Sequence, residues 1–367
     1  MFRSQSRPSF IASLLSLTLT SLVSSAAPLE IVLVESKAVT VEAVPNWKKE
    51  GFKAVAVILD ERAIATALTE VSRRVAENGL DLYYWIEVGQ NREMAAKNPK
   101  LMAALGSHSD WQKNFPKFPE PGIGEIAKAF PWVPIGYKEN FDAHLARIDR
   151  MLKRLPEGWR GVLLNDLQAG PSSCGCGNLQ CRWAIDYFVT PTTVKLEGND
   201  VAARFVAEVR KRTAGKAVIP VWTTECSDVD LPSDKNGGRP GTGFCGTVGC
   251  SHSACAEVFS AQWSALTSMN EGPTALLATH TALNRTQPEF GGGPGWLTNA
   301  IAYVNQTLPA HGGKPVRADQ LWVVVEGMES ANETRAREIA AKAGVGGLIS
   351  ARVRIDQTYE PRMIRTK

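Results

Sequence analysis

Apolar runs rich in β-branched and aromatic residues recur along the chain and predict eight β-strands. Several runs are continuously apolar and do not alternate with polar residues, which is typical of strands buried on both faces of a parallel sheet. The predicted strands are residues 29–36, 52–60, 80–88, 161–167, 217–225, 274–280, 320–326 and 344–350. The pattern therefore favours a parallel sheet with covered faces.

Stretches with helical spacing of apolar residues lie between these runs. They are residues 61–78, 93–105, 140–154, 199–213, 254–268, 296–307 and 331–343, with a shorter helix expected near residue 47. Eight strands alternating with helices predict a (β/α)8 TIM barrel, an α/β fold. We expect one barrel domain over residues 29–355, and residues 356–367 are expected to form a C-terminal tail.

Several helix boundaries have recognisable signals. Asn140 and the pair Asn199-Asp200 stand where helix N-caps are expected. Gly79, Gly215 and Gly344 directly follow the ends of predicted helices, where a left-handed residue commonly stops a helix. These signals support the alternation of strands and helices.

The first 26 residues have the features of a secretory signal peptide. Arg3 and Arg7 precede an apolar and hydroxylated stretch at residues 10–23, and small residues follow at 24–27. No later stretch of the sequence is long and apolar enough to span a membrane. We therefore expect a signal peptide at residues 1–26 and a secreted or periplasmic mature protein.

The charge balance points to no particular partner. The chain has 41 Lys and Arg against 37 Asp and Glu, which gives a net charge of +4. It has no basic tract and no nucleic-acid-binding motif, so nucleic acid is not expected as a partner. The sequence assigns no oligomeric state.

Carboxylic acids stand at the carboxyl ends of several predicted strands, where barrel enzymes build their active sites. Asp166 ends the fourth strand and Glu326 the seventh, and we take them as the leading catalytic pair. Two carboxyls across a barrel mouth suit glycoside hydrolysis, in which one protonates the leaving oxygen and the other attacks or activates water. Glu225, at the end of the fifth predicted strand, is a third catalytic candidate that could replace Asp166 as proton donor.

Other polar and aromatic side chains are candidates for substrate binding. Asn165, Glu87 and His280 also lie at predicted strand ends, although an ion pair, a helix cap or a core position would explain each alone. Trp132 and Trp296 lie in predicted loops, and we expect them to contact a sugar ring by stacking.

All seven cysteines fall in two clusters that follow the fourth and fifth predicted strands, in long loops. They are Cys174, Cys176, Cys181, Cys226, Cys245, Cys250 and Cys255. In an exported protein, disulfides bracing the two loops are the first interpretation, although an odd number leaves one thiol over. A structural zinc ion held by these cysteines, with His252 between Cys250 and Cys255, is the alternative. An iron–sulfur cluster is disfavoured, and no other cofactor is indicated.

Two segments carry a resemblance to known proteins. They read DLYYWIEVGQNREMAAKNPKLMAALGSHSDWQKNFP at 81–116 and LLNDLQAGPSSCGCGNLQCRWAIDY at 163–187. The chain resembles the barrel glycoside hydrolases, and more closely a group of uncharacterised glycosidase-like exported bacterial proteins. The resemblance implies that Asn165-Asp166 matches the Asn-Glu pair of the barrel clan, with Asp in place of the acid/base Glu, and that Glu326 matches the nucleophile.

Three functional hypotheses follow. The first is an exported glycoside hydrolase-like barrel that acts on a carbohydrate through paired carboxylates. The second is a noncatalytic glycan-binding barrel whose loops are braced by a structural metal or by disulfides. The third is a metal-dependent enzyme that uses the Cys/His loop, which requires an open coordination position.

Overall fold

The computed structural model describes most of the chain outside the cysteine-containing segments. The described residues are 27–105, 112, 116–123, 125–167, 184–185, 194–223, 262–278, 280, 283, 294–295, 297–298, 301, 304, 315–327, 330–355 and 360–365. The predicted signal peptide, Glu225, Trp296 and all seven cysteines lie outside these residues.

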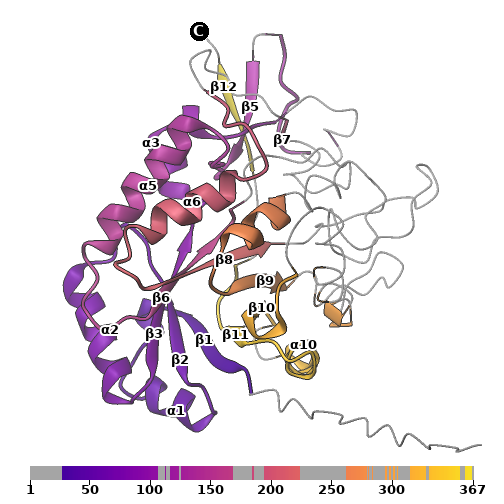
Figure 1. The fold of residues 1–367 in the computed structure, drawn as a ribbon. Coiled ribbons are helices and arrows are strands. Elements are labelled where there is room, and N and C mark those ends of the chain that lie inside the picture. The colour runs from indigo at the N-terminus through magenta and orange to yellow at the C-terminus, as the bar shows by residue number, and fades with distance from the viewer. Residues whose placement is uncertain are drawn as a thin grey trace, which may run out of the picture.

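Eight parallel strands form a closed barrel and confirm the predicted TIM-barrel fold (Figure 1). The strands are β1 (Leu29–Glu35), β2 (Ala54–Ile58), β3 (Asp81–Glu87), β6 (Gly161–Asn165), β8 (Ala217–Thr223), β9 (Thr274–Ala278), β10 (Leu321–Val325) and β11 (Gly347–Ala351). Neighbouring strands follow one another in the chain, and β11 pairs with β1 to close the barrel. Each strand lies within or next to one of the eight predicted apolar runs.

The barrel strands are buried on both faces, which explains their continuous apolar sequence. Ile31 and Leu33 of β1 belong to a cluster to which all eight barrel strands contribute and no helix does, so this cluster fills the barrel interior. Val32 and Val34 belong to a larger cluster that also contains helix residues, so they face outward. Side chains that alternate between two apolar environments leave no need for polar positions.

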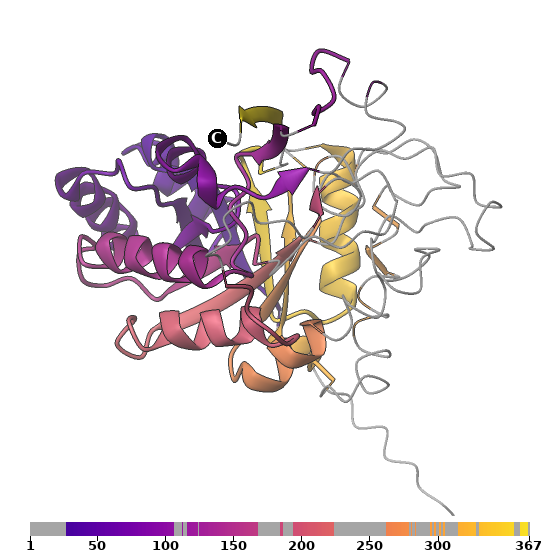
Figure 2. The same cartoon turned by 90° about the horizontal axis from the view of Figure 1, so that it is seen from above.

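Helices cover the outside of the barrel (Figures 1 and 2). They are α1 (Ala43–Lys49), α2 (Ala65–Glu77), α5 (Lys138–Leu152), α6 (Val201–Arg210) and α10 (Ala331–Lys342), and residues 262–269 are also helical. Along α2 the buried residues Leu68, Val71 and Val75 recur at helical spacing on one face. Among the described residues no helix is long and apolar enough to cross a membrane.

The predicted helix boundaries hold at most positions. Gly79, Gly215 and Gly344 have φ angles of 69°, 83° and 72°, as expected where a left-handed residue ends a helix. Asp200 is the N-cap residue of α6, although its side chain makes no capping hydrogen bond. Asn140 is not a cap, because α5 begins at Lys138 and buries Asn140, whose amide donates to the carbonyls of Leu101 and Pro134.

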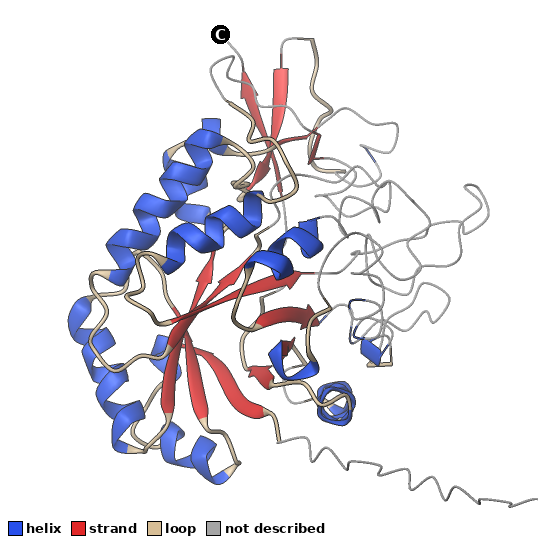
Figure 3. Cartoon of the chain, viewed as in Figure 1, coloured by secondary structure: helices blue, strands red, loops and turns tan. Residues whose placement is uncertain are grey.

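A second, smaller sheet lies beyond the carboxyl ends of the barrel strands (Figure 3). Its strands are β4 (Ala104–Leu105), β5 (Glu125–Phe130), β7 (Ala184–Ile185) and β12 (Glu360–Arg365), paired antiparallel in the order β12-β5-β4-β7. These strands belong to the segments that follow β3, β6 and β11. The small sheet therefore stands on the face where barrel active sites are found.

This sheet corrects one sequence-based expectation and adds a strand to the predicted C-terminal tail. The helix predicted over residues 93–105 is shorter: α3 (Arg92–Lys97) is followed by a 3-10 turn (Pro99–Leu101) and then by β4. The predicted C-terminal tail contains β12, which pairs with β5 along its whole length. The Arg362 guanidinium lies 3.1 Å from the centroid of the Phe130 ring, so a cation–π contact adds to the pairing.

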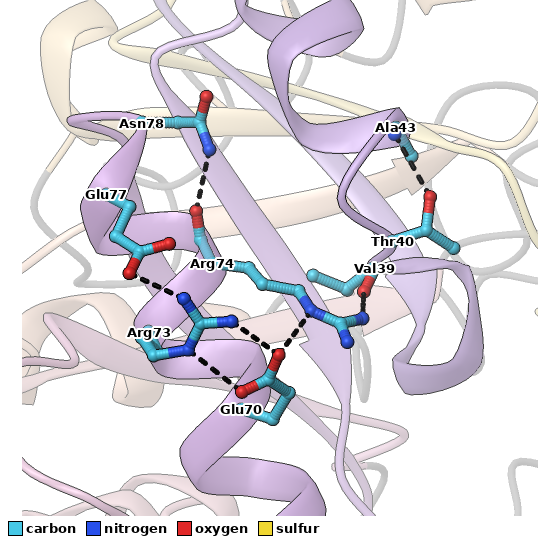
Figure 4. A network of polar contacts seen from close by, with 8 residues as sticks. All are labelled: Val39, Thr40, Ala43, Glu70, Arg73, Arg74, Glu77 and Asn78. Carbon is cyan, nitrogen blue, oxygen red and sulfur yellow. Dashed lines mark hydrogen bonds and ion pairs between the residues drawn. The ribbon is translucent and has the colours of Figure 1, made fainter.

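A polar network joins α2 to the segment after β1 (Figure 4). Arg74 Nη1 donates to the Val39 carbonyl at 2.6 Å, and its Nε donates to Glu70 at 2.8 Å. Hydrogen bonds from Arg73 are the main cause that lowers the pKa of Glu70 to about 2. Because these side chains are partly exposed, solvent screens their charges, and the network serves mainly to orient α2.

Candidate active site

Three of the sequence-predicted site residues face the mouth of the barrel. Glu87, Asn165 and Glu326 each stand two positions beyond an inward-facing residue of their own strand. Those residues are Trp85, Leu163 and Val324. Because side chains alternate along a strand, the three polar groups continue the inward row at the carboxyl ends of β3, β6 and β10.

Glu87 and Asn165 are adjacent and bonded to each other. They are register partners on β3 and β6, and Asn165 Nδ2 donates to Glu87 Oε2 at 2.9 Å. The indole of Trp85 donates to Glu87 Oε1 at 2.6 Å. Burial raises the pKa of Glu87 to about 7, and the two donors together with nearby Arg147 only partly offset this effect. Glu87 is therefore a carboxyl that exchanges its proton near neutral pH.

Glu326 has a contrasting environment. Its side chain is fully buried, and its Oε2 accepts the backbone N–H of His280 at 3.0 Å. Its Oε1 accepts the backbone N–H of Ile355 and lies 3.4 Å from Nε of Arg354. Amide and guanidinium donors stabilise the ionised form of a carboxyl. Glu326 thus accepts backbone N–H groups and lies near a guanidinium, whereas Glu87 accepts only from neutral side chains and has a raised pKa.

His280 lies beside Glu326, because β9 and β10 are neighbouring strands. The backbone N–H of His280 donates to Glu326 Oε2. On the other side, Ile355 belongs to the cluster that fills the barrel interior, so the segment after β11 returns to the mouth. Glu326 therefore joins the ends of β9 and β10 to the segment after β11.

Asp166 is held differently from the other strand-end residues. It follows inward-facing Asn165, is buried, and adopts a φ angle of 58°. Its carbonyl accepts the backbone N–H of Gly89 at 3.1 Å. A Cβ atom built on Gly89 would lie 2.4 Å from Asp166 Oδ2, so the carboxyl packs directly against the Gly89 backbone. Asp166 and Glu326 are both buried at strand ends, but Asp166 is packed onto the segment after β3.

We expect Gly89→Ala to destabilise the protein by about 1–3 kcal/mol, because overpacking at a buried site forces neighbouring groups to move. The added methyl would meet the carboxyl and carbonyl of Asp166. Urea unfolding measures the change, and Gly272→Ala is the matched control, since a Cβ there meets nothing within 4 Å. Equal stability of the two variants would contradict the close packing of Asp166 on Gly89.

Trp132 does not occupy the position expected of a ligand contact. Its side chain is fully buried, and its backbone forms an isolated bridge with Gln90. The carbonyl of Trp132 also accepts the N–H of Ala103 at 3.0 Å. These pairings hold residues 131–133 against the segment after β3, so Trp132 is a core side chain and not a surface for stacking a sugar.

The remaining sequence-predicted site residues, Glu225, Trp296 and the seven cysteines, lie outside the described residues. Within the part of the chain that the structure describes, no group of three or more His, Cys, Asp or Glu side chains could hold a metal ion. The disulfide and zinc interpretations of the cysteine clusters therefore both stay predictions.

Arg147, which lies near Glu87, was not among the site residues predicted from the sequence. Arg147 of α5 is buried, and its Nη2 donates to the Glu87 carbonyl at 2.6 Å. It stands three and four positions from His144 and Met151, which belong to the buried face of the helix. A charged residue on the apolar face of an amphipathic helix is the signal that could have identified it.

Comparison with known proteins assigns no activity to this chain. No protein-family model matches it, and no curated protein matches it either. Solved structures that are similar include the catalytic domain of a β-amylase from Paenibacillus polymyxa, with 9% identity, a TM-score of 0.46, and coverage of 88% of this chain and 92% of that one. A β-galactosidase from Marinomonas has 11% identity, a TM-score of 0.46, and coverage of 88% of this chain and 53% of that one. A class V chitinase from Pseudomonas fluorescens has 10% identity, a TM-score of 0.41, and coverage of 81% and 68%.

Proposed function

We propose that this chain is a glycoside hydrolase-like barrel that acts on a carbohydrate through two carboxyls, Glu326 and Glu87. The observation that carries the proposal is the contrast between them. Both continue inward-facing rows at the carboxyl face of the barrel, yet donors favour the ionised form of Glu326 while burial favours the protonated form of Glu87. Glycoside hydrolysis requires this division between an ionised carboxylate and a carboxylic acid.

Glu326 is assigned the role of nucleophile or base. As a nucleophile it would attack the anomeric carbon, and as a base it would take a proton from the attacking water. Asn165 is a positioning residue, because its amide holds one oxygen of Glu87. The other oxygen of Glu87 accepts from Trp85, so the carboxyl has a fixed orientation in the mouth.

Glu87 is assigned the role of proton donor to the leaving oxygen. The sequence favoured Asp166 or Glu225 for this role, but Asp166 packs against the Gly89 backbone and Glu225 lies outside the described residues. A carboxyl with a pKa near 7 still carries its proton in part of the molecules at neutral pH. Donor efficiency is highest when the pKa lies near the working pH, which Glu87 satisfies.

The direct test is to incubate the purified protein with a panel of aryl glycosides and polysaccharides. Hydrolysis is measured as the release of reducing ends. Proton NMR of the first product formed then identifies its anomeric configuration. Retention would identify Glu326 as a nucleophile, and inversion would identify it as a base. Release at the same rate by the Glu326→Gln variant would contradict the proposal.

A second candidate function is a noncatalytic glycan-binding barrel, and the burial of Glu326 favours it. Both oxygens of Glu326 already accept backbone N–H groups, from His280 and Ile355, so the carboxyl could be a structural anchor. This function predicts glycan binding without release of reducing ends. It also predicts that Glu326→Gln lowers the stability of the fold and leaves glycan affinity per folded molecule unchanged.

A further inference from the structure

A pocket of about 390 Å³ opens beside Glu87, between the segments after β2 and β3 and helix α5. Its lining includes Asp60, Glu61, Glu87, Glu93, Arg92 and Arg147. Its volume is near the lower end of the range for small-molecule sites, which is about 300–1,000 Å³. The pocket therefore suits one sugar ring better than a longer oligosaccharide.

Three of the four acidic side chains in the lining are already neutralised by cations. The pairs are Asp60 with Arg62 at 3.5 Å, Glu61 with Arg150 at 2.9 Å, and Glu93 with Lys97 at 2.6 Å. Only Glu87 accepts from neutral side chains, those of Trp85 and Asn165. The fixed negative charge of the pocket is therefore largely compensated without Arg92 or Arg147.

Arg147 is a buried cation without a counter-charge in contact. It is 2% exposed, and within the described residues it makes no ion pair and its Nε has no hydrogen-bond partner. Burial lowers the pKa of Arg147 to about 10, which leaves it protonated at neutral pH. Burying a charge without an ion pair is costly, and an anionic ligand in contact with Arg147 would offset that cost.

Arg92 adds a second positive charge to the lining. It is exposed, lies 5.5 Å from the centroid of the Phe130 ring, and makes no ion pair with any described residue. With the three acid–base pairs set aside, the lining presents two guanidinium groups and one carboxyl, Glu87. When Arg150 and Lys97, which pair with lining acids from outside the lining, are counted with it, five cations face four acids, and this slightly positive balance favours an anion.

We propose that this pocket binds the carboxylate of an acidic sugar, with Arg147 as its buried counter-charge and Arg92 as a second cation at the rim. The proposal rests on the proposed carbohydrate function and names its substrate class. The planar fork of a guanidinium matches the two oxygens of a carboxylate. A singly charged ligand also suits Glu87. The protonated form of Glu87 can donate a hydrogen bond to a carboxylate, and its ionised form would repel a monoanion less strongly than a dianion.

Isothermal titration calorimetry of the full chain tests this with three probes: methyl glucuronide, methyl glucoside and methyl glucoside 6-sulfate. We expect the glucuronide to bind at least about tenfold more tightly than the glucoside, because hydrogen bonds to charged groups are the stronger ones. Arg147→Gln is expected to remove that preference. Arg92→Gln should weaken glucuronide binding severalfold without a folding defect, since Arg92 is exposed. Lys100→Gln is the control for loss of an exposed cation outside the lining, and it should retain the preference.

Several outcomes would overturn the proposal. Equal binding of glucuronide and glucoside, or no binding of either, would remove the anion site. If the sulfate ester binds more tightly than the glucuronide, the preferred ligand is a sulfated sugar and not a sugar carboxylate. Hydrolysis of neutral glycans without a glucuronide preference would sink this inference and leave the proposed function standing. Another result is that the protein binds glucuronide, that Arg147→Gln abolishes this binding, and that no glycan is hydrolysed. This result would support the anion site and contradict the proposed hydrolase activity.

Discussion

Glu326→Gln is expected to lower kcat by about 10³-fold or more, because an amide can neither attack the anomeric carbon nor take a proton from water. Glu326 is the carboxyl that accepts the backbone N–H groups of His280 and Ile355 and lies near the guanidinium of Arg354. The measurement is steady-state hydrolysis of the best substrate found on the glycan panel. A variant that keeps full kcat would exclude Glu326 from the chemistry.

The same substitution also has a structural cost that must be separated from the chemical one. One end of the Gln side chain is an NH₂ group, which would face a backbone N–H in place of an acceptor oxygen. We therefore expect a lower Tm for Glu326→Gln. Glu333→Gln is the matched control, because Glu333 is also buried but belongs to helix α10. If that variant loses stability and keeps kcat, loss of turnover in Glu326→Gln is not a general effect of altering a buried carboxyl.

The barrel was the most predictable part of this molecule, for a physical reason. Strands covered on both faces must be apolar at every position, so their sequences stand out as unbroken runs. The fourth run predicts a strand over residues 161–167, and β6 spans Gly161–Asn165. The run exceeds the strand because Leu167 is still buried although the chain has turned away at Asp166.

The small sheet was not predictable from the same pattern. Strands β4 and β7 have two residues each, which is too short for any periodicity to appear. Strand β12 reads EPRMIR, in which charged residues and a proline hide the extended conformation. These strands form because barrel loops bring them together in space, and sequence order carries no record of that proximity.

The sequence located the strand-end carboxyls but did not separate their roles. Glu87, Asn165 and Glu326 face the mouth because each continues an inward row, whereas Asp166 is one position past Asn165 and turns at positive φ. A pattern of acids at strand ends does not show this difference in direction. The raised pKa of Glu87 was equally hidden, because it depends on burial and on hydrogen bonds from neighbouring side chains.

The pH dependence of the reaction should identify Glu87 as the proton donor. Burial raises the pKa of Glu87 to about 7, although Trp85, Asn165 and Arg147 act to lower it. The fraction of molecules with protonated Glu87 therefore falls as the pH rises through 7. We therefore expect kcat/KM to decline about tenfold per pH unit above that value. Glu87→Gln should be slow on ordinary glycosides, should lack this alkaline limb, and should recover activity on dinitrophenyl glycosides, whose leaving group needs no proton.

The pH dependence of the unfolding free energy is a second, independent test of the raised pKa of Glu87. A carboxyl whose pKa is higher in the folded than in the unfolded chain contributes stability fully below about pH 4.5, and this contribution is lost as the pH rises through about 7. The shift corresponds to a loss on the order of 2–3 kcal/mol, to be measured by urea unfolding at pH 5 and pH 8. Glu87→Gln should reduce the difference in unfolding free energy between the two pH values.

If Asp166→Asn, and not Glu87→Gln, abolishes the alkaline limb of the rate profile, the proton donor is Asp166, and the role of Glu87 is confined to binding.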